Sequence, residues 1–204
     1  METIRKAELS DADIVASLVL ETGQRFLPLI FGPHVKLILG KLIRVPGTIL
    51  YIDNIYVLES DERRVVGAVV AFPGKTVKRR AFKTLLTLFR IMGVELFKRL
   101  PNMTLILSRN KVRNDEFYIS NIAVDKAYRG RGFGSKLMKF VERLALNAGV
   151  KKITLDVENT NINAIELYKK LGYRGVATKR VYIRGQKFVF IRMEKELKPE
   201  VEKT

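Results

Sequence analysis

Apolar residues occur in short β-rich runs and in helix-spaced groups along this chain, which is typical of a domain that combines a sheet with helices. The β-rich runs predict strands at 3–9, 49–58, 65–72, 117–124, 152–157, 173–183 and 188–194. Short polar turns at 59–62 and 184–186 separate neighbouring runs and predict two hairpins. The pattern therefore predicts an α+β domain with one sheet of about seven strands.

Helix-spaced apolar residues fall between these strands. The stretch 10–13 resembles a capping box, and it precedes a helix with Ile14, Leu18 and Val19 on its apolar side. Residues 37–42 predict a second helical piece. A further helix follows a glycine-rich turn, and its apolar residues are Leu137, Met138, Val141, Leu144 and Ala145.

Positive charge is concentrated between two predicted strands. Residues 75–113 contain eleven Lys or Arg and one acid, Glu95, in a chain of net charge +17. The same stretch has apolar residues at helical spacing, namely Phe82, Leu85, Leu86, Phe89, Met92 and Leu96. It predicts one or two basic amphipathic helices, within a helical insertion at 73–115.

Three interpretations of this insertion compete. The favoured one is a cap on the sheet with a solvated basic face. The second is that the charge attracts an acidic substrate or an anionic cofactor. The third is contact with nucleic acid, anionic lipid or the ribosome, but no recognition motif accompanies the charge, which disfavours nucleic acid as a partner.

Composition limits the remaining choices. The 204 residues predict a single domain at 1–195 and a charged tail at 196–204. No apolar stretch reaches the length of a membrane span, and the N-terminus lacks the apolar core of a signal peptide, so we expect a cytoplasmic protein. Cysteine is absent, which excludes disulfides, thiolate metal sites and a cysteine acyl-enzyme, and we expect no metal. His34 is the only histidine and lies in a predicted turn, so a Ser-His-Asp triad is disfavoured.

The glycine-rich turn joins the strand at 117–124 to the following helix. Gly130, Gly132 and Gly134 lie where the helix begins, and there unpaired N–H groups and the helix dipole favour an anion such as a pyrophosphate. The order of residues after Gly134 excludes a P-loop, and the glycine spacing excludes the dinucleotide fingerprint. On the glycines alone, a plain strand-to-helix turn explains the segment equally well.

Two motifs resemble the GNAT superfamily of N-acetyltransferases. Arg129, Gly132 and Gly134 match its Arg/Gln-x-x-Gly-x-Gly/Ala signature. The second block of the superfamily is Asn-x-x-Ala-x-x-Leu-Tyr-x-x-Leu-Gly-Tyr/Phe, and its positions are filled by Asn161, Ala164, Leu167, Tyr168, Leu171, Gly172 and Tyr173. The resemblance is specific over 117–174 and weakest over 73–114.

This resemblance implies a fold and a cosubstrate. The implied fold is a twisted mixed sheet flanked by helices, which splays between the strands ending at Val124 and Val157 and binds acetyl-CoA in the splay. The pantetheine arm would pair with the backbone of Ile122, Ala123 and Val124. The pyrophosphate would contact a turn formed by Gly130, Arg131, Gly132, Phe133, Gly134 and Ser135. Arg129 and Arg131 would add positive charge, and Asn161 would cap its helix and hydrogen-bond CoA.

Roles for two further side chains follow from the resemblance together with their chemistry. Tyr168 matches the general acid assigned in many relatives, and a phenol keeps its proton at pH 7. Asp156 occupies the place of a glutamate in N-terminal acetylating relatives, and strand alternation turns it toward the cleft, so it is the candidate base. Its shorter side chain favours proton removal through a water. Glu116, or a water held by backbone carbonyls, remains a rival base.

The sequence thus predicts an acetyl-CoA-dependent N-acetyltransferase that acts on a primary amine of a small molecule, peptide or protein. The alternative is a non-catalytic acyl-CoA-binding regulatory module that docks on an anionic partner through the basic insertion. The acceptor amine is not identified by the sequence. Dimers are frequent in the superfamily, so a homodimer is compatible with the resemblance.

Overall fold

The computed structural model of this chain describes residues 2–99 and 112–198. Its centre is a seven-stranded sheet in the order β1-β2-β3-β4-β5-β7-β6. Neighbouring strands are antiparallel except β4 and β5, which are parallel. The strands are β1 (Thr3–Lys6), β2 (Ile55–Glu59), β3 (Val65–Pro73), β4 (Glu116–Val124), β5 (Lys152–Glu158), β6 (Arg174–Ile183) and β7 (Gln186–Glu196). The predicted sheet of about seven strands is confirmed.

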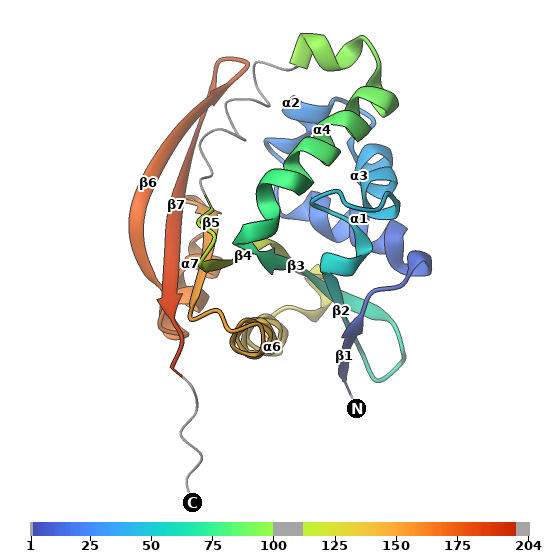
Figure 1. Cartoon of the computed structure of the whole chain (residues 1–204). Coiled ribbons are helices and arrows are strands. Elements are labelled where there is room, and N and C mark those ends of the chain that lie inside the picture. Colours follow the sequence, from blue (N-terminus) through green and yellow to red (C-terminus); the bar gives the residue numbers. More distant parts are fainter. Residues whose placement is uncertain (1, 100–111, 199–204) are drawn as a thin grey trace, which may run out of the picture.

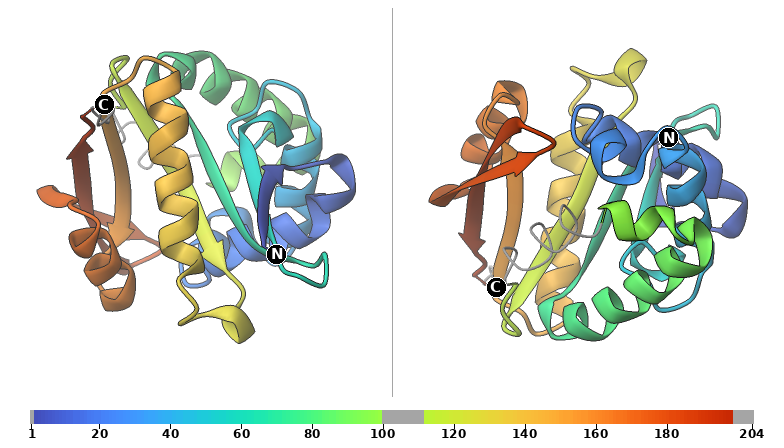
Figure 2. Two further views of the ribbon diagram at one scale, coloured as in Figure 1. Left: turned by 90° about the horizontal axis from the view of Figure 1, so that it is seen from below. Right: turned by 90° about the horizontal axis from the view of Figure 1, so that it is seen from above.

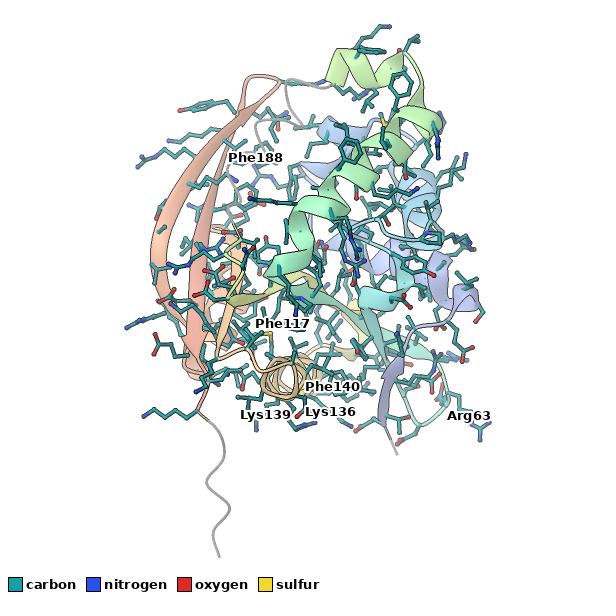
Figure 3. All side chains as sticks on the ribbon, in the orientation of Figure 1. Arg63, Phe117, Lys136, Lys139, Phe140 and Phe188 are labelled. Carbon is teal, nitrogen blue, oxygen red and sulfur yellow. The ribbon has the colours of Figure 1, made fainter. Side chains whose placement is uncertain are left out.

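Helices cover both faces of the sheet (Figures 1 and 2). The α-helices include α1 (Ala12–Glu21), α2 (Leu27–Phe31), α3 (Val35–Arg44), α4 (Val77–Met92), α6 (Phe133–Asn147) and α7 (Ile162–Lys170), and residues 95–99 are also helical. One apolar core forms between the sheet and α1 to α4, and a second between the sheet and α6 and α7. On α6, Phe140 packs on Tyr56 while Lys139 faces solvent (Figure 3). No helix in the described part of the chain is long and apolar enough to cross a membrane.

Three details of the N-terminal half differ from the sequence-based expectation. Residues 49–54 form turns instead of the start of a strand, because the Asn54 amide donates to the Ile49 carbonyl over 2.9 Å. The capping box forms two residues earlier than 10–13, at the start of a short 3-10 helix (Leu9–Asp11), where Asp11 accepts from the Glu8 backbone N–H over 2.8 Å. The carboxylate of Asp11 is also paired with Arg5 over 2.6 Å. Helix α2 is an additional element that the pattern does not predict.

The basic stretch contains the amphipathic helix α4, but its apolar residues divide between two sides. Leu88 is buried and Leu85 is partly buried against the first core. Phe82, Leu86 and Phe89 are instead exposed, so the outer face is apolar as well as basic. Residues 100–111 of the predicted insertion lie outside the described residues. At the other end, β7 runs to Glu196, and Leu197 is buried, so the packed part extends past the predicted boundary at 195.

Strands β4 and β5 pair only over their first halves. Residues 116–119 of β4 lie beside 152–155 of β5, and beyond them the two strands separate. On its other side β4 stays paired with β3, with a bulge at Ser120 between the pairs Ala71–Ile119 and Val70–Asn121. The β5-facing backbone edge of residues 120–124 therefore has no strand partner within residues 2–99 and 112–198, because its pairing with β3 uses the opposite edge.

Candidate functional site

The separation of β4 and β5 creates a cavity of about 150 Å³, hereafter the β4–β5 cleft. It is lined by Thr22, Phe26, Ile119, Ser120, Asn121, Ile122, Leu155, Asp156, Val157, Glu158, Asn161, Ala164, Tyr168 and Phe190. The predicted splay is thus present, and it brings Ile122, Asp156, Asn161 and Tyr168 into one cavity. Ala123 and Val124 continue the open edge of β4 beyond it.

The glycine-rich turn lies where β4 leads into α6. Gly130 and Gly132 both have φ of +80°, a left-handed conformation that strongly favours glycine, and a Cβ at either would project into open space. The first helical hydrogen bond of α6 runs from the Lys136 N–H to the Gly132 carbonyl, so the N–H groups of Phe133, Gly134 and Ser135 precede it. Three N–H groups at the positive end of a 15-residue helix, next to open space, fit a pyrophosphate.

Gly134 has a packing role as well. A Cβ there would lie 3.0 Å from Cδ2 of Leu167 on α7, which is tighter than ordinary contact. The glycine therefore lets α6 and α7 approach each other, and this places the turn close to the helix that carries Tyr168. The side chain of Phe133 is buried in the second core, so only its backbone can serve a ligand.

The two arginines of the turn are already held by protein groups. Arg129 donates to the Val124 carbonyl over 2.9 Å and to Glu21 of α1 over 2.8 Å. The guanidinium of Arg131 lies over the ring of Tyr128, 5.1 Å from its centre. Arg129 thus fixes the turn to β4 and α1, while Arg131 is an exposed positive charge that contacts only a ring of the same turn in the interactions described above.

Tyr168 and Asn161 belong to the same helix, α7. Asn161 caps it, because its side-chain oxygen accepts from the Ala164 N–H over 3.3 Å, which confirms the predicted cap. Tyr168 is buried at the wall of the β4–β5 cleft. Burial raises the pKa of its phenol to about 12, because the ionised form would lose its hydration. The phenol therefore retains its proton throughout the neutral range.

Asp156 is held in the cleft by neighbours on two strands. The Tyr118 hydroxyl on β4 donates to its Oδ2 over 3.0 Å. Arg192, its direct cross-strand partner on β7, approaches the same oxygen to 3.7 Å and lies 6.0 Å from the centre of the Tyr118 ring. A carboxylate with two oxygens can accept further hydrogen bonds, so Asp156 can still accept from a group in the cleft.

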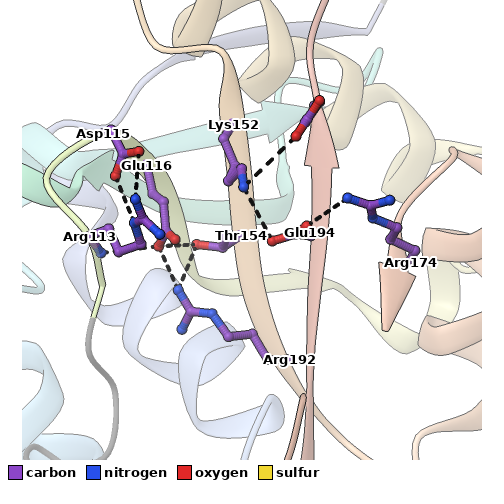
Figure 4. A network of polar contacts seen from close by, with 9 residues as sticks. Arg113, Asp115, Glu116, Lys152, Thr154, Arg174, Arg192 and Glu194 are labelled. Carbon is purple, nitrogen blue, oxygen red and sulfur yellow. Dashed lines mark hydrogen bonds and ion pairs between the residues drawn. The ribbon is translucent and has the colours of Figure 1, made fainter. Parts of the chain in front are cut away.

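Glu116, the rival base, is buried in a polar network at the start of β4 and shares Arg192 with Asp156 (Figure 4). Its Oε2 accepts from Arg192 over 2.6 Å, from Thr154 over 3.2 Å and from the Arg113 backbone over 3.1 Å. It does not line the β4–β5 cleft, nor does it line a second cavity that adjoins the cleft between the sheet and α1 to α4. This geometry favours a structural role for Glu116, and of the two candidate bases it leaves Asp156 as the one that lines the cleft.

Sequence reasoning missed Tyr118 and Arg192, which hold Asp156, and Ser120, Asn121 and Thr22, which form the cleft wall. Ser120 donates to Asn121 over 2.9 Å, and the Asn121 amide donates to Thr22 over 2.8 Å, so the bulge is tied to the end of α1. Alternation along β4 could have placed Tyr118 on the face opposite Phe117, as alternation on β5 did for Asp156. No local signal indicates that β7 lies next to β5.

Comparisons with known proteins agree with this geometry. A family model described as "Acetyltransferase (GNAT) family" matches residues 49–173, more than half of the chain. A thialysine N-epsilon-acetyltransferase of Sus scrofa is 44% identical over 57 residues, which are 28% of this chain and 34% of that protein. An N-alpha-acetyltransferase MAK3 of Arabidopsis thaliana is 37% identical over 65 residues, covering 32% of this chain and 33% of that one. These matches span about a third of the length of the curated relatives.

Likeness to solved structures extends over the whole fold. The crystal structure of an N-acetyltransferase from Staphylococcus aureus Mu50 superposes with a TM-score of 0.73 at 23% identity, covering 95% of this chain and all of that chain. At this identity the likeness concerns the fold, a seven-stranded mixed sheet flanked by helices.

Proposed function

Because the chain belongs to the GNAT acetyltransferase family, we propose that it transfers the acetyl group of acetyl-CoA directly to a primary amine. The observation that carries the proposal is the β4–β5 cleft, where an open strand edge and a buried tyrosine line one cavity, while the same strand leads into a glycine-rich helix start. A primary amine that attacks an acetyl thioester forms a C–N bond, the C–S bond breaks, and the departing sulfur needs a proton.

We assign the binding of acetyl-CoA to two backbone surfaces. The open edge of Ile122, Ala123 and Val124 offers hydrogen-bonding groups to the amides of the pantetheine arm, as a further strand would. The N–H groups of the turn from Gly130 to Ser135 receive the pyrophosphate, and Arg131 adds charge beside them. Asn161 faces the same cleft while it caps α7.

Tyr168 and Asp156 divide the proton transfers. The phenol of Tyr168 carries a proton that it can give to the sulfur, because its raised pKa prevents ionisation near pH 7. Asp156 accepts a proton from the ammonium or the attacking amine. Where the nitrogen lies beyond hydrogen-bond distance of the carboxylate, a water molecule relays this proton. Tyr118 and Arg192 are positioning residues, since they act on the reaction only by holding the Asp156 carboxylate.

Three further expectations from the sequence stay predictions within this proposal. They are a single domain over 1–195 with a basic helical insertion at 73–115 before the CoA-binding strand, compatibility with a homodimer, and a cytoplasmic location.

Replacing Gly132 with valine is expected to weaken CoA binding at least about tenfold. The added side chain projects into the open space in which the phosphates would lie, and left-handed backbone is unfavourable for it. Isothermal titration with CoA measures the change.

Gly149→Val is the matched control for this variant. Gly149 lies just past the other end of α6, its φ is +71°, and a Cβ there also meets nothing within 4 Å. Both variants should therefore lose a similar amount of stability, about 1–2 kcal/mol, whereas only the change at Gly132 should affect CoA. Equal CoA affinity in both folded variants would contradict the assignment of the turn.

Replacing Asp156 with asparagine is expected to lower kcat/KM about tenfold, because an amide cannot take up the proton of the attacking amine as a carboxylate does. Steady-state rates with a working amine test it. Glu158→Gln is the control, a second carboxylate on the same strand and in the same cleft, which is paired with Arg25. An equal loss in both variants would indicate a general charge effect instead of a base.

A further inference from the structure

A second cavity of about 240 Å³ opens beside the β4–β5 cleft, between the sheet and α1 to α4. We call it the apolar pocket. It is lined by Val19, Phe26, Leu27, Ile30, Phe31, Leu39, Leu42, Ile49, Leu50, Thr84, Leu85, Leu88, Tyr118, Ser120, Asn121, Asp156, Lys179, Val181 and Phe190. Phe26, Ser120, Asn121, Asp156 and Phe190 line both cavities, so the two meet at the candidate base.

Apart from Thr84 of α4 and Lys179 of β6, the polar groups of the apolar pocket gather at that junction. Tyr118, Ser120, Asn121 and Asp156 belong to the middle of β4 and β5, next to the cleft. The helical wall contributes aliphatic and aromatic side chains and one hydroxyl, that of Thr84. This hydroxyl is used within the protein, since it donates to the Arg80 carbonyl over 2.7 Å and accepts from the Ile49 N–H over 2.9 Å. A ligand would therefore meet an apolar surface at one end and a carboxylate at the other.

The size of the apolar pocket limits what it can hold. Cavities of about 150 Å³ lined by similar side chains accommodate a benzene molecule. At about 240 Å³, the pocket has room for one aromatic ring with a short linker, or for an alkyl chain of similar volume.

The charge of the pocket disfavours a polycationic acceptor. Asp156 is its only carboxylate among the described lining residues, and Arg192 lies 3.7 Å from that carboxylate. Lys179 of β6 adds a positive charge to the lining. A second ammonium group of a polyamine would enter the aliphatic wall without a counter-charge, which is costly. An acceptor with one amine and one apolar group matches the lining instead.

We propose that the acceptor is a primary amine bearing an apolar group of about the size of a phenyl ring, with this group in the apolar pocket and the nitrogen beside Asp156. The proposal rests on the proposed acetyl transfer, and it names the substrate class of the same site. Such an amine can come from a free arylalkyl or alkyl amine, or from the N-terminus of a peptide with an apolar side chain.

The first test is kcat/KM for a series of amines at saturating acetyl-CoA. From ethylamine through butylamine to hexylamine, kcat/KM is expected to rise about fourfold per methylene, and 2-phenylethylamine should also be a good acceptor. Ethanolamine and spermidine should be poor acceptors. A second arm compares the peptide amides Phe-Ala-Ala-Ala and Ser-Ala-Ala-Ala, and transfer to the Phe peptide would assign the source to a peptide. The inference is overturned if kcat/KM for spermidine or ethanolamine equals that for hexylamine, or if kcat/KM for the Ser peptide equals that for the Phe peptide. Either result would leave the proposed acetyl transfer intact.

The second test changes the pocket. Leu85→Trp places an indole at the partly buried α4 position that lines it, and it should remove the gain from longer chains while ethylamine is still acetylated. Leu86→Trp is the matched control, because Leu86 is the next residue of the same helix and is 42% exposed. Equal chain-length dependence in the two folded variants would overturn the inference.

Calorimetric binding of 2-phenylethylamine to the CoA-saturated protein separates this inference from the proposed activity. The pocket assignment is supported if Leu85→Trp abolishes this binding and Leu86→Trp retains it. This holds even if no amine is turned over, and in that case only the proposed acetyl transfer is refuted. Absence of binding in the wild-type protein, together with turnover of polar amines, overturns the pocket assignment alone.

Discussion

Replacing Tyr168 with phenylalanine is expected to lower kcat about 100-fold, the usual contribution of a positioned general acid, while CoA affinity changes little. The variant keeps the ring, which is buried in the second core, and removes only the hydroxyl at the cleft wall. Steady-state rates with a working amine and calorimetric titration with CoA measure the two quantities.

Tyr173→Phe is the matched control for this loss. Tyr173 is also buried, its ring centre lies 6.1 Å from that of Tyr168, and it is not among the residues that line the β4–β5 cleft. It should retain wild-type turnover. Wild-type turnover in Tyr168→Phe would refute the general-acid role. A protein that binds CoA and acetylates no amine or peptide would instead favour a binding module without turnover.

The raised pKa of Tyr168 adds a pH criterion. Because burial raises this pKa to about 12, the acid stays protonated, and therefore active, until the pH approaches that value. Any decline in the wild-type rate between pH 8 and 10 must then arise from another group.

Replacing Glu116 with alanine is expected to reduce the free energy of unfolding by about 3 kcal/mol, because it leaves the guanidinium of Arg192 without its closest partner. Glu116 is 3% exposed and accepts three hydrogen bonds, from Arg192, Thr154 and the Arg113 backbone. For a chain of this size the melting temperature should fall by about 6–12 °C. Thermal and urea unfolding, followed by circular dichroism, measure the change.

Two further variants serve as comparisons for the stability loss in Glu116→Ala. Asp115→Asn alters the neighbouring carboxylate, which is exposed, and should leave the melting temperature within about 2 °C. Glu116→Gln keeps the shape of the side chain and some of its hydrogen bonds, so it should be the milder change. If Glu116→Gln melts like the wild type and yet loses more turnover than Asp156→Asn, the roles of the two carboxylates are reversed from our assignment.

The sequence predicts those parts of the site that are encoded within one segment. The glycine turn and the α7 cap depend on contacts between near neighbours, so their motifs were sufficient. The face of Asp156 followed from alternation along a single strand. Tyr118 and Arg192 reach Asp156 from two other strands, and their contribution depends on a strand order that no local pattern encodes. The same holds for the apolar pocket, whose walls come from four helices and four strands.

Predictions failed where side chains or solvent override a local pattern. Residues 49–54 have apolar content suited to a strand, but Asn54 and Thr84 satisfy backbone groups at Ile49 and stabilise turns there. Helix α4 has too many apolar residues for its single buried stripe, so Phe82 and Phe89 are exposed despite their spacing. Periodicity alone does not reveal which apolar residues a helix buries when they surround much of its circumference.

The bulge at Ser120 lets one strand serve two incompatible patterns. Before the bulge, the odd-numbered Phe117 and Ile119 pack against α6. After it, the even-numbered Ile122 and Val124 do, because the one extra residue at the bulge reverses which positions face the helix. With strict alternation, the polar Asn121 would point into that core and Ile122 away from it. The additional residue therefore lets β4 keep its apolar side chains on α6 while its polar ones reach the cleft. An alignment that places a gap at this position would assign the wrong face to every residue of β4 that follows.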